Sequence, residues 1–218
     1  PFMGLTEAIT AVEAAAQPSI IAPEAPLAGG ALGSAETLSE HASKAELARF
    51  GVPVPASLRI TSLGSLDTQL ANLTFPLVLK AEGMAHKSDS GGVALGLTTP
   101  DAVHSAAIKM GGTSWLVEEM TIGTVAELLV GVTRDEAHGL LLTLGAGGVM
   151  TELLQDTVSM LLPVTAQGIK QALTGLKCAP LLTGYRGKPA ANIEAITQVI
   201  LSVQDYVVAH APLIGEVE

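Results

Sequence analysis

The segment that most constrains this chain is the run over residues 75–97, FPLVLKAEGMAHKSDSGGVALGL. It begins with apolar residues interrupted only by Lys80, which predicts a buried strand over Leu77–Ala81 with a cation at its end. A polar loop follows and closes on Gly91 and Gly92, where a backbone without side chains can approach an anion. A cation and a glycine turn beside a buried strand favour phosphate binding, so ATP chemistry is our first hypothesis.

The charge balance restricts the partners of the chain. Its 218 residues carry a formal net charge of -10, with 11 Lys and Arg against 21 Asp and Glu. Nucleic-acid binding needs a basic face, so we expect no nucleic-acid partner. Gly, Pro or charged residues interrupt every apolar run before it reaches the length of a membrane span, so we expect no membrane partner.

Cysteine usage and the start of the chain bear on its location. The single cysteine, Cys178, excludes an internal disulfide, and no signal peptide is visible, so we expect a cytoplasmic protein. The first residue is Pro1 and not Met, which suggests a processed or excised piece of a longer protein.

The chain divides into three zones. Residues 1–36 contain no Lys or Arg, and helical spacing gives way there to Pro and Gly, which predicts the terminal helix of a preceding domain followed by a linker. Residues 37–120 and 121–218 are predicted to form two α+β lobes that meet near residues 119–123. We therefore predict an α+β fold with a ligand between the lobes.

The expected elements follow from periodicity and from turn residues. In the first lobe we expect helices near residues 39–50, 65–73 and 100–110, and strands near residues 58–61, 77–81, 93–97 and 115–119. In the second lobe we expect strands near residues 126–133, 140–144 and 158–164, and helices near residues 166–174 and 192–210. The last helix is predicted most strongly, because it carries one continuous apolar stripe.

Common phosphate motifs are missing from the sequence. There is no Walker-type G-x-x-x-x-G-K-[ST], residues 145–148 do not fit the Rossmann spacing, and the H-R-D and D-F-G signatures of protein kinases are absent. Explanations that involve no ligand therefore stay open at this point. Lys80 alone can be a lysine whose stem is buried and whose head reaches water, and residues 86–89 alone can be a solvated turn.

Six motifs, in order, carry a resemblance to a known family. They are Leu79-Lys80, His86-Lys87-Ser88-Asp89-x-Gly91-Gly92-Val93, Val117-Glu118-Glu119-Met120, Glu127-Leu128-Leu129-Val130-Gly131-Val132-x-Arg134-Asp135, Gly145-x-Gly147-Gly148-x-x-x-Glu152-x-x-x-Asp156 and Gly184-x-Arg186-Gly187. Together they resemble the ATP-grasp domain of the ADP-forming (NDP-forming) acyl-CoA synthetases, relatives of succinyl-CoA synthetase. Upstream, the segment Leu38-Ser39-Glu40 through Lys44 to Gly51-Val52-Pro53-Val54-Pro55 looks like the opening helix and turn of that family. The resemblance covers residues 38–218 and implies an ATP-grasp fold, in which two α+β lobes clamp a nucleotide.

The resemblance also implies a set of nucleotide-binding residues. They are Lys80, Lys87, Ser88, Gly91, Gly92, Glu118, Glu119, Met120, Glu127 and Arg186. Lys80 would bind the α and β phosphates, the glycine loop would fold over the phosphates, and the segment from Glu118 to Met120 would read the adenine edge. Arg134 and Arg186 could clamp phosphate oxygens, although pairing with Asp135 or with a helix C-terminus is the alternative.

In the family, acyl-CoA, ADP and phosphate give the acid, CoA and ATP by way of a phosphohistidine. The resemblance assigns the catalytic roles to His86, which would pass the phosphoryl group to ADP, and to Arg134. The implied cofactors are ATP or ADP and Mg²⁺. Hard oxygen donors suit that ion, and Glu152, Asp156 and Glu218 are its candidate ligands.

The implied partners are the CoA-binding and CoA-ligase domains of the same polypeptide, with acyl-CoA and phosphate as substrates and an oligomer as the full-length form. The chain would be an excised nucleotide-binding piece, inactive alone, that stops just short of a metal-binding asparagine. Two alternatives stay open. One is a regulatory nucleotide-binding module of an acetyltransferase fusion, and the other is an α/β ligand module without nucleotide affinity.

Overall fold

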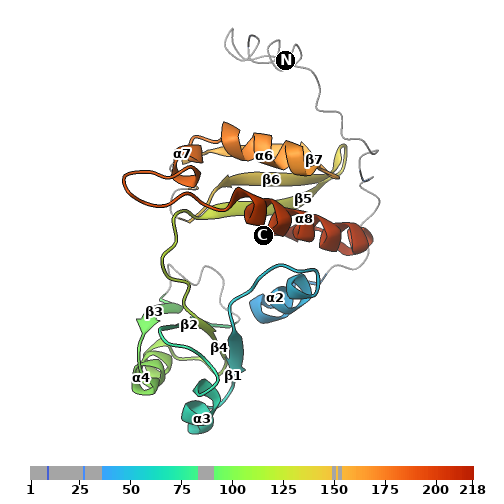
Figure 1. The fold of residues 1–218 in the computed structure, drawn as a ribbon. Coiled ribbons are helices and arrows are strands. Elements are labelled where there is room, and N and C mark those ends of the chain that lie inside the picture. The colour runs from blue at the N-terminus through green and yellow to red at the C-terminus, as the bar shows by residue number, and fades with distance from the viewer. Residues whose placement is uncertain (1–8, 10–26, 28–35, 83–90, 149–150, 152–153) are drawn as a thin grey trace.

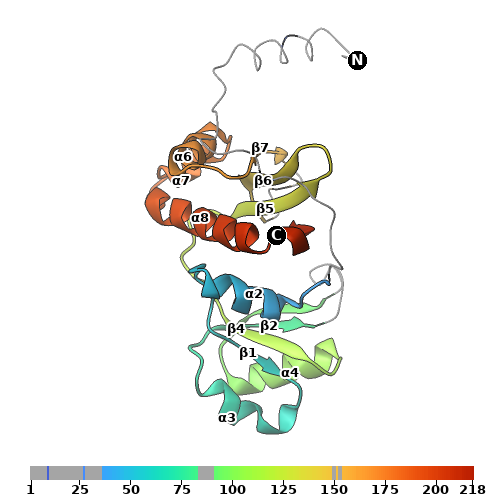
Figure 2. The same ribbon diagram turned by 90° about the vertical axis from the view of Figure 1, so that its right-hand side faces the viewer.

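The computed structural model describes residues 9, 27, 36–82, 91–148, 151 and 154–218. Within these residues the chain forms two four-stranded antiparallel sheets, each covered by helices, and the two units lie one above the other (Figures 1 and 2). The predicted α+β class is confirmed. No helix in the described part of the chain combines the length and the hydropathy needed to cross a membrane.

The first lobe is built on the sheet with strand order β1-β4-β2-β3. Its strands are β1 (Ser57–Ile60), β2 (Leu77–Ala81), β3 (Val93–Leu97) and β4 (Trp115–Glu119). The helices α3 (Leu66–Leu70) and α4 (Pro100–Met110) pack on one face. Because side chains alternate along a strand, β2 sends Leu77 and Leu79 into this helical core and sends Val78 and Lys80 to the opposite face.

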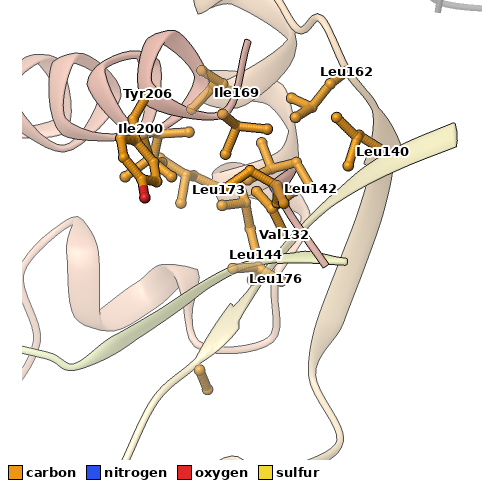
Figure 3. Packing of buried hydrophobic residues seen from close by; sticks show 14 of the residues in the cluster. Val132, Leu140, Leu142, Leu144, Leu162, Ile169, Leu173, Leu176, Ile200 and Tyr206 are labelled. Carbon is orange, nitrogen blue, oxygen red and sulfur yellow. The ribbon is translucent and has the colours of Figure 1, made fainter. Parts of the chain in front are cut away.

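The second lobe is built on the sheet with strand order β7-β6-β5-β8. Its strands are β5 (Leu128–Asp135), β6 (Gly139–Ala146), β7 (Thr157–Leu161) and β8 (Glu216–Val217). The helices α6 (Ala166–Gly175) and α8 (Ile193–Ala209) cover this sheet, and the short helix α7 (Ala179–Leu182) lies between them in sequence. Figure 3 shows their shared core, in which Leu142 and Leu144 meet Ile169, Leu173 and Ile200.

Helix α2 (Glu40–Arg49) lies between the two lobes. It begins at Ser39, whose hydroxyl accepts a hydrogen bond from the N–H of Ala42, as the sequence predicted. Its apolar residues Leu47 and Phe50 pack against the core of the second lobe. The Phe50 ring meets the Tyr206 ring edge-on, with centroids 5.4 Å apart. Although α2 precedes the first sheet in the chain, its apolar contacts are therefore with the second lobe.

Most predicted elements are present, and four of them (β2, β3, α4 and β4) have the predicted bounds. Helix α3 begins at Leu66, directly after Ser65 as predicted, but it ends at Leu70 instead of residue 73, and a 3-10 helix η1 (Leu63–Ser65) capped by the Ser62 hydroxyl precedes it. Strand β7 ends at Leu161 instead of residue 164, since Pro163 has no N–H to donate to a neighbouring strand. The helix and linker predicted over residues 1–36 fall almost wholly outside the described residues.

Candidate functional site

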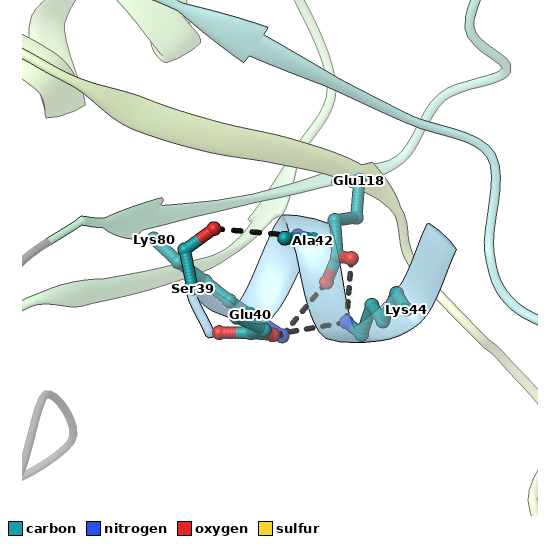
Figure 4. A network of polar contacts seen from close by, with 6 residues as sticks. All are labelled: Ser39, Glu40, Ala42, Lys44, Lys80 and Glu118. Atoms are coloured by element: carbon teal, nitrogen blue, oxygen red, sulfur yellow. Dashed lines mark hydrogen bonds and ion pairs between the residues drawn. The ribbon is translucent and has the colours of Figure 1, made fainter. Parts of the chain in front are cut away.

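The face of the first sheet turned away from α3 and α4 carries charged side chains beside buried apolar ones. In the antiparallel register of β2 and β4, Val78 lies opposite Glu118 and Lys80 lies opposite Leu116. Lys80 and Glu118 are therefore diagonal neighbours on one face. Helix α2 covers this face with Glu40 and Lys44, which lie one helical turn apart (Figure 4).

These four residues form what we call the charge cluster: Glu40, Lys44, Lys80 and Glu118. The Lys80 Nζ atom lies 2.7 Å from Glu118 Oε2 and 2.5 Å from Glu40 Oε1. The Lys44 Nζ atom lies 2.5 Å from Glu118 Oε1 and 2.9 Å from Glu40 Oε1. Each carboxylate thus contacts both ammonium groups, and opposite charges alternate around the cluster (Figure 4).

Burial differs within the charge cluster. The Glu118 side chain is only 4% exposed, whereas those of Lys80, Lys44 and Glu40 are 23%, 24% and 27% exposed. Burial by itself lowers the pKa of Lys80, but the hydrogen bonds and charges of Glu118 and Glu40 outweigh burial and raise that pKa above its ordinary value. Lys80 is therefore a full cation at neutral pH, which binding to a phosphate requires.

The predicted glycine turn ends beside Lys80. The carbonyl of Gly92 accepts a hydrogen bond from the N–H of Ala81 at 2.8 Å, so the residue after Lys80 is tied to this turn. Gly91 has a φ of +74°, a left-handed conformation that favours glycine. The predicted loop residues His86, Lys87 and Ser88 lie outside the described residues.

The chain crosses to the second lobe just after β4 (Figure 1). Here the carboxylates of Glu118 and Glu119 point to opposite faces, and Glu119 Oε1 accepts a hydrogen bond from the N–H of Thr74 at 2.7 Å. The backbone N–H groups of Glu119 and Met120 donate to carbonyls of Ala56 and Pro76. Of these two carboxylates at the crossing, Glu118 is thus the one that shares a face with Lys80.

In the second lobe, a glycine turn at the end of β6 holds Glu127. The N–H of Gly147 donates to the Glu127 carbonyl at 2.9 Å, and a Cβ on Gly147 would lie 2.8 Å from the backbone of Leu128. Gly148 has a φ of +61°, and a Cβ on it would overlap the Glu127 carboxylate. Only glycines allow this close approach. A pocket of about 180 Å³ beside the turn is lined by Glu127 and by apolar residues.

The structure places Asp156 in a scaffold role. Its two carboxylate oxygens accept hydrogen bonds from the N–H groups of Lys177 and Cys178, each at 2.8 Å. Burial raises the pKa of Asp156, but these hydrogen bonds outweigh burial and lower it below its ordinary value. Asp156 directly precedes β7 and therefore ties the segment before α7 to the start of that strand, which the sequence did not indicate. Its role in binding magnesium stays a prediction.

Arg134 holds the C-terminal segment of the second lobe. Its Nε donates to the carbonyl of Ile214 at 2.8 Å, and its Nη2 donates to the carbonyl of Ala211. These carbonyls lie just beyond the C-terminus of α8, in and after the 3-10 helix η2 (Ala211–Leu213). The contacts are of the kind that the sequence analysis left open as the alternative to a phosphate clamp. The catalytic role of Arg134 stays a prediction.

Arg186 and Glu218 lie in exposed places. The Arg186 guanidinium lies 5.3 Å from the centroid of the Tyr185 ring. Glu218 follows β8 and lines a groove of about 870 Å³ between α2 and the end of the second lobe. This groove carries four carboxylates, from Glu36, Glu46, Glu216 and Glu218.

Among the described residues, no three His, Cys, Asp or Glu side chains converge closely enough to hold a metal ion. Glu152 lies outside the described residues.

Two residues of the charge cluster, Glu40 and Lys44, belong to the opening-helix motif of the resemblance but were not predicted as site residues. Their spacing of four residues on a predicted helix was a detectable signal for an ion pair. Nothing local indicated that this ion pair would lie on the face of a sheet formed by residues beyond position 56.

Comparison with known proteins places the chain in a family. A family model described as an ATP-grasp domain matches residues 31–218. The chain belongs to the ATP-grasp domain family. The predicted ATP-grasp fold is thereby confirmed, and the domain is related to those of ADP-forming acetyl-CoA synthetases.

Two curated relatives illustrate the relationship. A trans-feruloyl-CoA synthase from an unknown prokaryotic organism is 32% identical over 193 residues, which cover 82% of this chain and 27% of that enzyme. The beta subunit of an ADP-forming acetate–CoA ligase II from Pyrococcus furiosus is 27% identical over 180 residues, which cover 77% of this chain and 76% of that subunit. The chain thus spans about a quarter of the first relative's length.

Solved structures agree in fold. An acetyl-coenzyme A synthetase 1 of Ca. Korarchaeum cryptofilum, bound to coenzyme A and Ca-AMPCP, is 28% identical, and the match covers 82% of this chain and 83% of that chain with a TM-score of 0.76. The same synthetase with coenzyme A and Mg-AMPPCP, its phosphohistidine segment pointing towards the nucleotide binding site, gives 30% identity, 81% coverage of each chain and a TM-score of 0.70.

Proposed function

We propose that the chain binds ATP or ADP between its two lobes, as the nucleotide-binding part of an ADP-forming acyl-CoA synthetase. The observation that carries the proposal is Lys80, an ammonium group kept charged by two carboxylates and tied through Ala81 to a glycine turn. An ammonium beside exposed backbone is suited to binding the α and β phosphates. The related Korarchaeum synthetase, crystallised with nucleotide analogues, supports the assignment.

The remaining nucleotide contacts are proposed from the family motifs. Gly91 and Gly92 would lie over the phosphates, and Glu118 to Met120 would contact the base at the crossing between the lobes. Glu127, held at the entrance of the second lobe by the Gly147 turn, would lie near the ribose or the metal ion. Lys87, Ser88 and Arg186 complete the proposed set.

The proposed reaction passes a phosphoryl group between a phosphohistidine and ADP. His86 would accept the phosphoryl group from a first phosphohistidine in the CoA-ligase region, whose imidazole is the leaving group, and would transfer it to the terminal phosphate of ADP bound near Lys80, while Arg134 would assist from the second lobe. The CoA-binding and CoA-ligase regions of a longer enzyme would bind acyl-CoA and phosphate. Its relatives carry out ligations to coenzyme A, which supports this assignment.

Magnesium is the proposed metal. Carboxylate oxygens are the donors that Mg²⁺ prefers, and Glu218 presents one in the groove beside α2. We propose Glu218 and Glu152 as its ligands, and the ion would neutralise the charge of the transferring phosphoryl group. We propose Asp156 as a further ligand, because each of its carboxylate oxygens keeps a second lone pair beside the hydrogen bond that it accepts from Lys177 or Cys178.

Calorimetric titration of Mg-ADP and Mg-ATP into the protein tests nucleotide binding. We expect saturable binding that Lys80→Met weakens by about tenfold or more, since a charge-assisted contact to phosphate is lost. Lys109→Met is the matched control, because Lys109 lies in the last turn of α4, outside the charge cluster. Absence of binding by the unaltered protein would overturn the proposal.

A labelling experiment tests the phosphoryl transfer itself. Incubation of the longer enzyme with ATP labelled in its γ-phosphate should give an acid-labile phosphohistidine that is lost in His86→Asn. Normal ATP formation by His86→Asn would rule out the proposed role of His86. Nucleotide binding without any phosphohistidine would instead support a regulatory nucleotide-binding module.

A further inference from the structure

Helix α2 has two faces with different partners. Leu47 and Phe50 pack on the core of the second lobe, whereas Glu40 and Lys44 form ion pairs with residues of the first sheet. The helix is therefore joined to one lobe by apolar packing and to the other by charge. A change in the charge cluster therefore alters the contact of α2 with the first lobe. That contact lies at the boundary between the lobes, where the proposed nucleotide site lies.

The charge cluster is balanced, with two lysines and two glutamates. Glu118 is its most buried member and is held from two sides, since Lys80 contacts Oε2 and Lys44 contacts Oε1. Lys80 is shared between Glu118 and Glu40. If Lys80 turns to a phosphate, Lys44 is the cation of the cluster that stays with Glu118.

We infer that Glu40 and Lys44 are positioning residues of the nucleotide site, and that they act on Lys80 in opposite directions. Lys44 stays paired with the Glu118 carboxylate and balances its charge, which allows Lys80 to exchange that carboxylate for a phosphate. Glu40 holds Lys80 in its resting position and competes with the phosphate. This inference rests on the proposed function.

The opposite signs follow from charge burial. A buried carboxylate without a partner is strongly unfavourable, so a protein that lacks Lys44 would keep Lys80 on Glu118. A protein that lacks the Glu40 charge would lose one of the two anions that compete for Lys80. If Glu40 and Lys44 only stabilised the fold, loss of either partner of their ion pair would change the nucleotide affinity in the same direction.

Nucleotide affinity is the first test. We expect Lys44→Met to weaken Mg-ADP binding by about tenfold, and Glu40→Gln to strengthen it by about threefold, the range that loss of one ionic contact produces. Lys170→Met and Glu194→Gln are matched controls, because they remove the same kinds of charge from an ion pair between α6 and α8. Changes of the same sign in Lys44→Met and Glu40→Gln, or no change in either, would overturn the inference.

Two further variants keep the test decisive if Lys44→Met folds poorly. Lys44→Arg retains a cation beside Glu118 and should restore an affinity close to that of the unaltered protein. The double variant Glu40→Gln/Lys44→Met should still bind Mg-ADP more weakly than Glu40→Gln alone. An affinity for Lys44→Arg as low as that of Lys44→Met would contradict the role of charge.

Chemical reactivity of Lys80 gives a readout without nucleotide. Acetylation of Lys80 at pH 9, followed by peptide mass spectrometry with Lys109 as the internal reference, should be about threefold faster in Glu40→Gln and slower in Lys44→Met, because the carboxylates hold the Lys80 proton. If the unaltered protein binds no nucleotide, the proposed function fails, and this labelling alone decides the ion-pair assignment. Equal labelling in the three proteins would then overturn it.

Discussion

Two buried carboxylates in this protein are held in different ways. Glu118 in the first lobe is 3% exposed and Asp156 in the second is 6% exposed. The partners of Glu118 are two lysine ammonium groups at the ends of long side chains, and those of Asp156 are two backbone N–H groups. Ammonium groups can rotate to a new anion, whereas backbone donors cannot leave without unfolding the loop. We therefore call Glu118 the exchangeable carboxylate and Asp156 the scaffold carboxylate. The type of partner, and not the degree of burial, distinguishes them.

The largest effect should come from breaking the scaffold carboxylate. Asp156→Ala leaves the N–H groups of Lys177 and Cys178 without their acceptor, so we expect a loss of about 3–5 kcal/mol in the free energy of unfolding. Urea unfolding measures it, and Asp205→Ala on the exposed face of α8 is the control. A loss below about 1 kcal/mol would show that the loop does not depend on Asp156.

Removing the exchangeable carboxylate should have a smaller effect on stability. Glu118→Gln leaves Lys80 and Lys44 with only Glu40, but both ammonium groups are about a quarter exposed and can turn to water. We expect a loss of about 1–2 kcal/mol in the same urea experiment. An effect equal to that of Asp156→Ala would remove the distinction between the two carboxylates.

Acidic pH should lower the free energy of unfolding in part through the scaffold carboxylate. The pKa of Asp156 is lowered in the folded protein, so its contribution is complete above the ordinary aspartate pKa of about 4 and is lost as the pH falls through the lower folded value. The free energy of unfolding should therefore decline by at most about 1.4 kcal/mol per pH unit from this group. In Asp156→Asn the free energy of unfolding should decline less steeply with falling pH between about pH 4 and the acid transition. A slope equal to that of the unaltered protein would contradict this.

Alkaline pH should lower the free energy of unfolding through the charge cluster, and this should be the smallest of the four effects. The pKa of Lys80 is raised in the folded protein, so its contribution is complete below the ordinary lysine pKa of about 10.4 and is lost as the pH rises through the higher folded value. We expect a loss below about 1 kcal/mol, because the ammonium group is partly hydrated. Lys80→Met should reduce the alkaline loss, which thermal unfolding across that pH range measures, and a loss as large as that of the unaltered protein would contradict this.

Sequence patterns predicted the parts of the site that depend on neighbours in the chain. The strand that ends at Lys80, the Gly91–Gly92 turn and the capped helix over Pro100–Met110 all follow from local periodicity and turn chemistry, and all were found. They were predictable because the residues that determine them lie within one element or one turn.

The contacts that were missed join distant parts of the chain. Asp156 binds backbone groups of residues 177 and 178, and Arg134 binds carbonyls of residues 211 and 214. Glu40 contacts Lys80 across 40 positions. Such contacts depend on how the elements pack, so local patterns in the sequence did not indicate them.

The alternation along β2 limits how this strand can change its length. Leu79 belongs to the helical core and Lys80 to the charge cluster, although they are adjacent in the chain. Deleting one residue between Pro76 and Lys80 would exchange the two faces, placing an ammonium group against α3 and α4 and a leucine beside Glu118. Homologous chains should therefore accept substitutions in this strand but no single-residue insertion or deletion, whereas the connections outside the sheet are open to both.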